Sequence, residues 1–125
     1  MASLTPHFAQ LDPADLQRLF QRLPEALDPG EDAQLRALAL GATLYTPGSR
    51  PDLIADIRRV HAAGARSQVL CLEDAIADHE VEFAQSNVVE ALGALADAAP
   101  GHQLFVRVRR PSQIAEIIGE LGDDA

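Results

Sequence analysis

The sequence contains no lysine and no tryptophan, a single cysteine, and aromatic residues at only 4% of its 125 positions. One cysteine cannot form an intramolecular disulfide, and no cluster of cysteine with histidine offers a structural zinc site. No stretch approaches the ~18 uninterrupted apolar residues of a membrane span, and the N-terminus lacks the basic start and apolar run of a signal peptide. We therefore expect a cytoplasmic protein that does not enter a membrane.

Positive charge is also scarce. Ten cations, all of them arginine, stand against 19 Asp and Glu, which gives a net charge of -9. This balance argues against nucleic acid or an anionic membrane as the main partner, because both require a basic face. The hydrophobic fraction of 47% is that of a folded chain, and the length allows one small domain.

Residues 1–38 are predicted to form a helical extension. Asp12 and Pro13 are a typical N-cap and first helical residue, and the helix should run to Pro24. Its apolar residues recur at helical spacing and should pack against a partner; they are Leu16, Leu19, Phe20 and Leu23. Residues 28–30 (Asp-Pro-Gly) are predicted to form a turn and residues 31–38 a second short helix.

From residue 39 to residue 125, short apolar runs alternate with amphipathic segments, a pattern typical of βα units. Strands are predicted over residues 40–45, 67–72 and 103–108, and helices over 53–63, 81–99 and 111–121. Connections this short predict a parallel α/β sheet with right-handed crossovers. Three parallel strands leave open edges, so we expect either the first units of a larger barrel or edges covered by the N-terminal helices or another subunit.

In barrels and open α/β sheets, functional groups gather at the carboxyl ends of the strands. After the first strand, residues 46–52 form a tight turn into a helix, where free backbone N–H groups favour an anion and Arg50 could add charge. A turn with a solvated arginine fits the local sequence equally well. Tyr45, at the strand end, could line a pocket or simply pack.

The second strand is followed directly by two acids, Glu73 and Asp74. Carboxylates at a buried strand end are unfavourable unless a cation pairs with them. They could approach a divalent metal directly or through water, or one could act as an acid or base. Alternatively, Asp74 is a helix N-cap and Glu73 a solvated loop residue. Cys71, within the strand, is predicted to be a core residue.

The third strand alternates between an apolar face and a face carrying Phe105, Arg107 and Arg109. In a barrel this second face points to the interior. An arginine near its upper end can bind a substrate carboxylate through two hydrogen bonds while lying near Glu73. The alternative is an arginine held only by an ion pair with Glu73 or Asp74.

These strand-end segments resemble those of the HpcH/HpaI aldolase and citrate lyase β-subunit family. Residues 44–51 (LYTPGSRP), 70–76 (LCLEDAI) and 105–108 (FVRV) are similar to the family's LxVPGxRP, LDLEDAV and VRVN segments, in the same order and spacing. The segments GATLY, LCLEDAIADHE and LFVRVR most closely resemble the bacterial TIM-barrel C–C bond lyases found in tellurite-resistance-type gene neighbourhoods.

The resemblance implies a TIM-barrel enzyme that makes or breaks a carbon–carbon bond next to a carboxylate, with Mg²⁺ stabilising an enolate. By this analogy Arg107 holds an oxoacid, while Glu73 and Asp74 are the acidic pair near the metal or bound to it through water. Arg50 matches the region that contacts a phosphate of coenzyme A in members using thioesters. The remaining expected substrate-binding residues are Tyr45, Gly48 and Arg109.

Two features depart from the family pattern. Arg109 stands where the family usually has Asn, and the absence of lysine removes a residue that often helps hold coenzyme A, so we do not expect a coenzyme A substrate. The family's direct metal ligands come from strands beyond the third, and a TIM barrel needs ~250 residues.

We therefore expect the N-terminal portion of a citrate-lyase-like enzyme, inactive alone, which forms a homo-oligomer or associates through exposed sheet edges. The alternative is a non-catalytic binding or assembly module that associates through the same edges.

Overall fold

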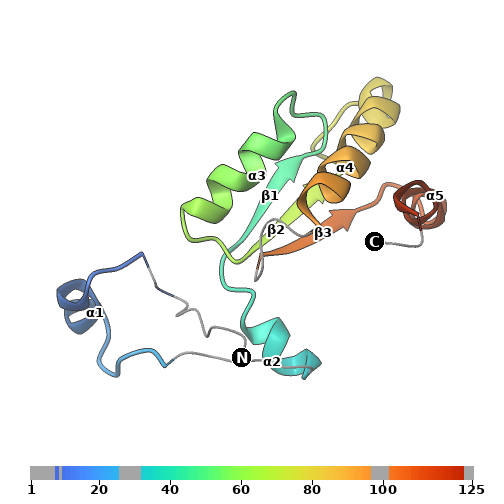
Figure 1. Cartoon of the computed structure of the whole chain (residues 1–125). Helices are drawn as coiled ribbons and strands as arrows, with labels where there is room; N and C mark the ends of the chain where they lie inside the picture. The colour runs from blue at the N-terminus through green and yellow to red at the C-terminus, as the bar shows by residue number, and fades with distance from the viewer. Residues whose placement is uncertain (1–7, 9, 26–31, 97–101, 123–125) are drawn as a thin grey trace.

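The computed structural model describes residues 8, 10–25, 32–96 and 102–122. Its elements, in chain order, are α1 (Pro13–Leu19), α2 (Ala33–Leu38), β1 (Thr43–Pro47), α3 (Leu53–Ala62), β2 (Ser67–Cys71), the 3-10 helix η1 (Asp78–Glu80), α4 (Val81–Leu95), β3 (Gln103–Arg107) and α5 (Ser112–Leu121) (Figure 1). The three strands form one parallel sheet in the order β1-β2-β3. This confirms the predicted α/β fold of three βα units.

The register of the sheet separates its two faces. Tyr45, Val69 and Phe105 lie in one row across the three strands, and Pro47, Cys71 and Arg107 lie in the next row toward the carboxyl ends. Alternate residues point to the other face, where Leu70 joins a single core cluster with residues of α3, α4 and α5, including Ile57, Val88 and Ile117. The three helices therefore cover one face of the sheet only.

Strand β1 lies two to three residues later than predicted. Thr46 and Pro47 were expected to end the strand, but both belong to it. Proline is tolerated because the next residue, Gly48, donates its N–H to the carbonyl of Cys71 at 2.8 Å. The nitrogen of Pro47 therefore lies on the open side of an edge strand, where no ladder hydrogen bond is lost. The other two strands each end one residue earlier than predicted.

The N-terminal helix is shorter than predicted. Asp12 caps α1 by accepting a hydrogen bond from Asp15 N at 2.8 Å, as expected, but the helix ends at Leu19 and buries none of its residues. Phe20 is extended, and its ring lies 4.9 Å from that of Phe8. The predicted stripe thus has no helix partner in the described part of the chain, and such a short helix gains little stability without packing.

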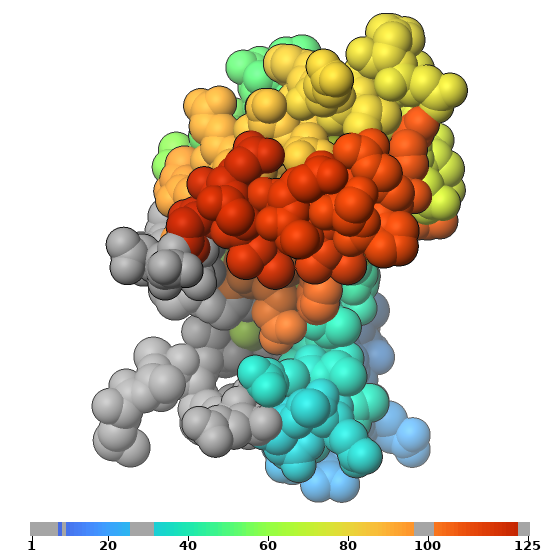
Figure 2. Space-filling model, turned by 90° about the vertical axis from the view of Figure 1, so that its right-hand side faces the viewer, coloured from blue at the N-terminus to red at the C-terminus, as the bar shows by residue number. Residues whose placement is uncertain are grey.

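Helix α2 begins at Ala33, with its N-terminal amides capped by Asp32. Figure 1 shows α1 and α2 beyond the amino ends of the strands, away from the layer of α3 and α4. Figure 2, turned by 90° from Figure 1, shows that α5 lies alongside α4. The predicted turn at residues 28–30 and the end of the helix predicted to reach residue 99 lie outside the described residues. Among the helices that are described, none could cross a membrane.

Candidate functional site

The carboxyl end of the sheet brings Arg107 together with the two acids predicted near it. Arg107 is the last residue of β3 and lies beside Cys71, the last residue of β2, so the acids that follow β2 are within its reach. Its Nε forms an ion pair with Glu73 Oε2, and its Nη1 lies 3.3 Å from Asp74 Oδ2. The three side chains therefore form a charged cluster at the edge where a site was expected.

Solvent reaches this cluster. The side chains of Arg107 and Glu73 are 41% and 40% exposed. Partial burial alone would lower the pKa of Arg107, but the negative charges of Asp74 and Glu73 outweigh it and raise the pKa above its ordinary value. Arg107 is thus a permanent cation, and exposed ion pairs of this kind contribute only about 0–1 kcal/mol. A ligand carboxylate can therefore replace one of its partners.

The contacts of Asp74 exclude one of the alternatives for the acids. Asp74 caps neither following helix, since Ala77 and Glu80 occupy the N-cap positions of η1 and α4. It accepts instead from Cys71 Sγ at 3.4 Å, and Cys71 is fully buried, as predicted. The helix-cap interpretation of Asp74 is therefore wrong.

The described residues do not complete a metal centre. They contain no group of three or more His, Cys, Asp or Glu side chains that could hold a metal ion. Glu73 and Asp74 are adjacent carboxylates, but both are paired with Arg107. Divalent cations such as Mg²⁺ take six ligands, several of which can be water. Glu73 and Asp74 could therefore contribute to a Mg²⁺ site directly or through water, but the described residues bring no third such side chain to them.

The turn after β1 is tightly packed at Gly48. A Cβ added there would lie 2.8 Å from Leu72 Cδ2 and 3.0 Å from Val88 Cγ2, so a side chain fits only if these neighbours shift. Asn87 Nδ2 donates to the carbonyls of Gly48 and Arg50, both at 2.8 Å. Asn87 was not among the residues predicted from the sequence, although it lies on α4 between the buried Ala84 and Ala91.

Arg50 is directed at α3, where its Nε is paired, while half of its side chain remains exposed. Its Nε lies 2.7 Å from Oδ2 of Asp56, a buried carboxylate that also contacts Arg59 at 2.6 Å. The hydrogen bond from Arg50, together with the positive charges, lowers the pKa of Asp56 despite its partial desolvation. The sequence analysis also overlooked Asp56. Arg50 is thus part of an ion-pair group that fixes the start of α3.

Tyr45 and Arg109 occupy different sides of the sheet. Tyr45 is 56% exposed on the edge strand of the open face, one row from Arg107, so it lines the surface that leads to the cluster. The guanidinium of Arg109 is turned instead toward the loop after β2, where it donates to the carbonyls of Leu72, Glu73 and Ile76.

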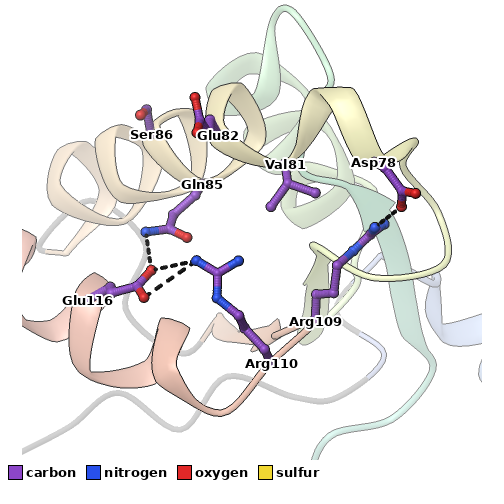
Figure 3. A pocket seen from close by; sticks show the side chains of 8 residues that line it. All are labelled: Asp78, Val81, Glu82, Gln85, Ser86, Arg109, Arg110 and Glu116. Atoms are coloured by element: carbon purple, nitrogen blue, oxygen red, sulfur yellow. Dashed lines mark hydrogen bonds and ion pairs between the residues drawn. The ribbon is translucent and has the colours of Figure 1, made fainter.

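A groove of about 540 Å³ runs between α4 and α5, with Arg109 and Asp78 at one end (Figure 3). At the other end, Glu116 accepts from Gln85 at 3.2 Å and pairs with Arg110 at 3.3 Å. The cluster of Arg107 with Glu73 and Asp74 does not line this groove. The groove is therefore separate from the strand-end cluster, and both of its arginines are paired with acids.

A comparison with protein-family models assigns the chain to a family. The model described as C–C bond lyase of the TIM-barrel fold matches residues 34–125, which include all three βα units and the strand-end cluster. No curated protein and no solved structure gives a match. The parallel βα units are consistent with part of such a barrel. The chain therefore belongs to the C–C bond lyase family of the TIM-barrel fold.

Proposed function

We propose that the chain is part of a citrate-lyase-like, Mg²⁺-dependent lyase or aldolase that acts on an oxoacid or a related carboxylate. The observation that carries this proposal is the placement of Arg107 at the carboxyl end of β3, on the open face, between two exchangeable carboxylates. Membership of the C–C bond lyase family supports the reaction type. The HpcH/HpaI-like motifs support the narrower assignment.

Arg107 binds the substrate carboxylate in this proposal. The guanidinium presents parallel N–H groups that match the two oxygens of a carboxylate. The incoming carboxylate replaces Glu73 or Asp74, so the positive charge remains neutralised while an acid of the protein is released. The released acid can accept or donate a proton beside the substrate.

Cleavage of a bond next to a carbonyl leaves its electron pair on an enolate, and a bound Mg²⁺ would stabilise that negative charge. Glu73 and Asp74 would lie near the ion or contact it through water. In the described part of the chain, no third ligating side chain joins these two carboxylates, so the remaining ligands must come from residues outside it. We therefore propose that the isolated chain does not turn over substrate.

The carboxylate contact can be tested with ¹⁵N-labelled chain titrated with pyruvate or oxaloacetate and followed by NMR. Arg107→Gln should weaken binding of both probes severalfold, because it removes the positive charge and the paired N–H groups that hold the carboxylate. The matched control is Arg110→Gln, since Arg110 is also exposed and paired with a carboxylate but lies on the helix side. Equal affinities for wild type and a folded Arg107→Gln variant would refute the assignment.

A non-catalytic assembly module is the second candidate. It is favoured by the apolar side chains that the helices leave exposed: Tyr45 and Phe105 on the open face and Ile114 and Ile118 on α5. In this proposal the chain forms a homo-oligomer or associates through its sheet edges. Analytical ultracentrifugation should show mass rising with concentration, whereas a monomer at high concentration would refute self-association.

A further inference from the structure

Arg109 lies two residues beyond the end of β3, and its guanidinium contacts the loop that follows β2. Its Nε donates to the carbonyl of Leu72 at 3.2 Å, and its Nη2 donates to the carbonyls of Glu73 at 2.7 Å and Ile76 at 3.0 Å. Its Nη1 pairs with Asp78. These contacts use all but one of the five N–H groups of the guanidinium.

The loop that Arg109 holds carries the acid pair. The last ladder bond of this region joins Leu72 N to Arg107 O at 2.9 Å, and the carbonyls that Arg109 binds lie beyond β2 and before η1. Fixing the carbonyls of Glu73 and Ile76 restricts the backbone on both sides of Asp74. Because the direction of a side chain follows from its backbone, this restriction also orients the carboxylates toward Arg107.

Arg109 is itself anchored to the helix layer. Its backbone N–H donates to Gln113 Oε1 at 2.7 Å, and Gln113, fully buried, donates from Nε2 to Gln85 Oε1 at 2.9 Å. This chain of contacts joins α4 and α5 to the end of β3. We infer that Arg109 is a positioning residue, which transmits the geometry of the helix layer to Glu73 and Asp74 and so sets their contact with Arg107.

The inference rests on the proposed function, because it takes the cluster around Arg107 as the site, and it replaces direct substrate binding by Arg109 with an indirect role. The geometry also explains why arginine is needed. Lysine offers three N–H groups from a single atom and asparagine two on a short side chain, whereas a guanidinium can reach three separated carbonyls at once.

NMR on the full 125-residue chain provides the test. Two readouts are measured in Arg109→Lys and Arg109→Gln: amide hydrogen exchange over residues 73–77, and the Nε–H resonance of Arg107, which reports its pairing with Glu73. We expect exchange in the loop to rise at least tenfold in both variants. The Arg107 resonance should move toward its position in Glu73→Gln, and the lysine variant should not restore the wild-type signal.

Two controls separate positioning from general destabilisation. Arg110→Lys makes the same change one residue later, where the guanidinium contacts Ser112 and Glu116. Asp78→Asn removes only the ion pair with an acid that is 97% exposed. Both should change loop exchange less than threefold. Urea unfolding of each variant verifies folding. If Arg109→Gln does not fold, the test is decided on Arg109→Lys, which keeps the charge and the aliphatic stem.

The inference is overturned if a folded Arg109→Lys keeps wild-type loop exchange, or if the loop loosens while the Arg107 resonance stays in place. The pyruvate titration decides the proposed function separately. If Arg109→Lys frees Arg107 while pyruvate binds no form of the chain, the proposed function fails and the positioning role stands. If Arg107→Gln abolishes pyruvate binding but Arg109→Lys leaves the Arg107 resonance unchanged, only the positioning role fails.

Discussion

The two faces of the sheet differ in cover, although the open face also carries a row of large apolar side chains. On the covered face, Leu70 is fully enclosed by residues of α3, α4 and α5. On the open face, Tyr45 and Phe105 flank Val69 in one row, yet they are 56% and 41% exposed. A solvent-exposed sheet face normally carries polar residues, whereas parallel strands are normally covered on both sides. The row of Tyr45, Val69 and Phe105 therefore resembles the faces that parallel sheets usually keep covered.

The largest difference between the faces should be seen in stability. Leu70→Ala creates a cavity in the core and should lower the free energy of unfolding by about 2–5 kcal/mol. Phe105→Ala, on the adjacent strand but the opposite face, removes more atoms and should nevertheless lower it much less. Urea denaturation followed by circular dichroism measures both. Similar losses for the two variants would mean that the open face is packed in solution.

Overpacking on the covered side should have the next largest effect. Gly48→Ala places a methyl group against Leu72 and Val88, both fully buried, and should destabilise the chain by about 1–3 kcal/mol. The matched control is Gly93→Ala on α4, where an added Cβ meets nothing within 4 Å. That change should stabilise the helix by roughly 0.5–1 kcal/mol. A neutral Gly48→Ala would show that the turn can move away from the core.

The contrast between the faces also explains how far the sequence could predict the structure. Alternation along 103–108 correctly assigned Phe105 and Arg107 to one face and the intervening apolar residues to the other, because strand geometry fixes that pattern. Glu73 and Arg107 were expected to meet because the carboxyl ends of neighbouring parallel strands share one edge. These predictions needed only local periodicity and topology.

Arg109 shows where such reasoning stops. Alternation placed it with Arg107, but β3 ends before residue 109, so the period of two no longer determines its direction. Its orientation depends on carbonyls from a loop more than thirty residues earlier and on the buried Gln113 of α5. The early end of α1 was not predictable from its apolar spacing either, because the structure leaves that stripe without buried residues.

The covered side carries a buried carboxylate whose effect should depend on pH. Hydrogen bonding to Arg50 lowers the pKa of Asp56 below its ordinary value of 3.8. The folded state therefore binds this proton less readily than the unfolded state, so its contribution to stability is present above pH 3.8 and is lost as the pH falls further. Urea unfolding between pH 5 and pH 3 should show a shallower loss in Asp56→Asn than in wild type.

Arg50→Gln provides the complementary test. Removing the main partner should return the pKa of Asp56 toward its ordinary value, and so reduce the loss of stability between pH 5 and pH 3. The reduction should be partial, because Arg59 still contacts the carboxylate at 2.6 Å. If Asp56→Asn keeps the wild-type slope, the acid sensitivity arises from other carboxylates and the covered side has no special role in it.

The smallest change in stability is expected for a polar substitution on the open face. Phe105→Gln should alter the free energy of unfolding by no more than about 0.5 kcal/mol, as is usual for surface positions. Its effect should appear instead in association, because it removes an exposed aromatic ring from the row that includes Tyr45 and Val69. Sedimentation at matched concentrations should give a lower average mass for this variant than for wild type, with Phe83→Gln, an exposed aromatic of α4, as the control. Loss of association in Phe83→Gln alone would mean that the helix layer, and not the open face, joins the chains.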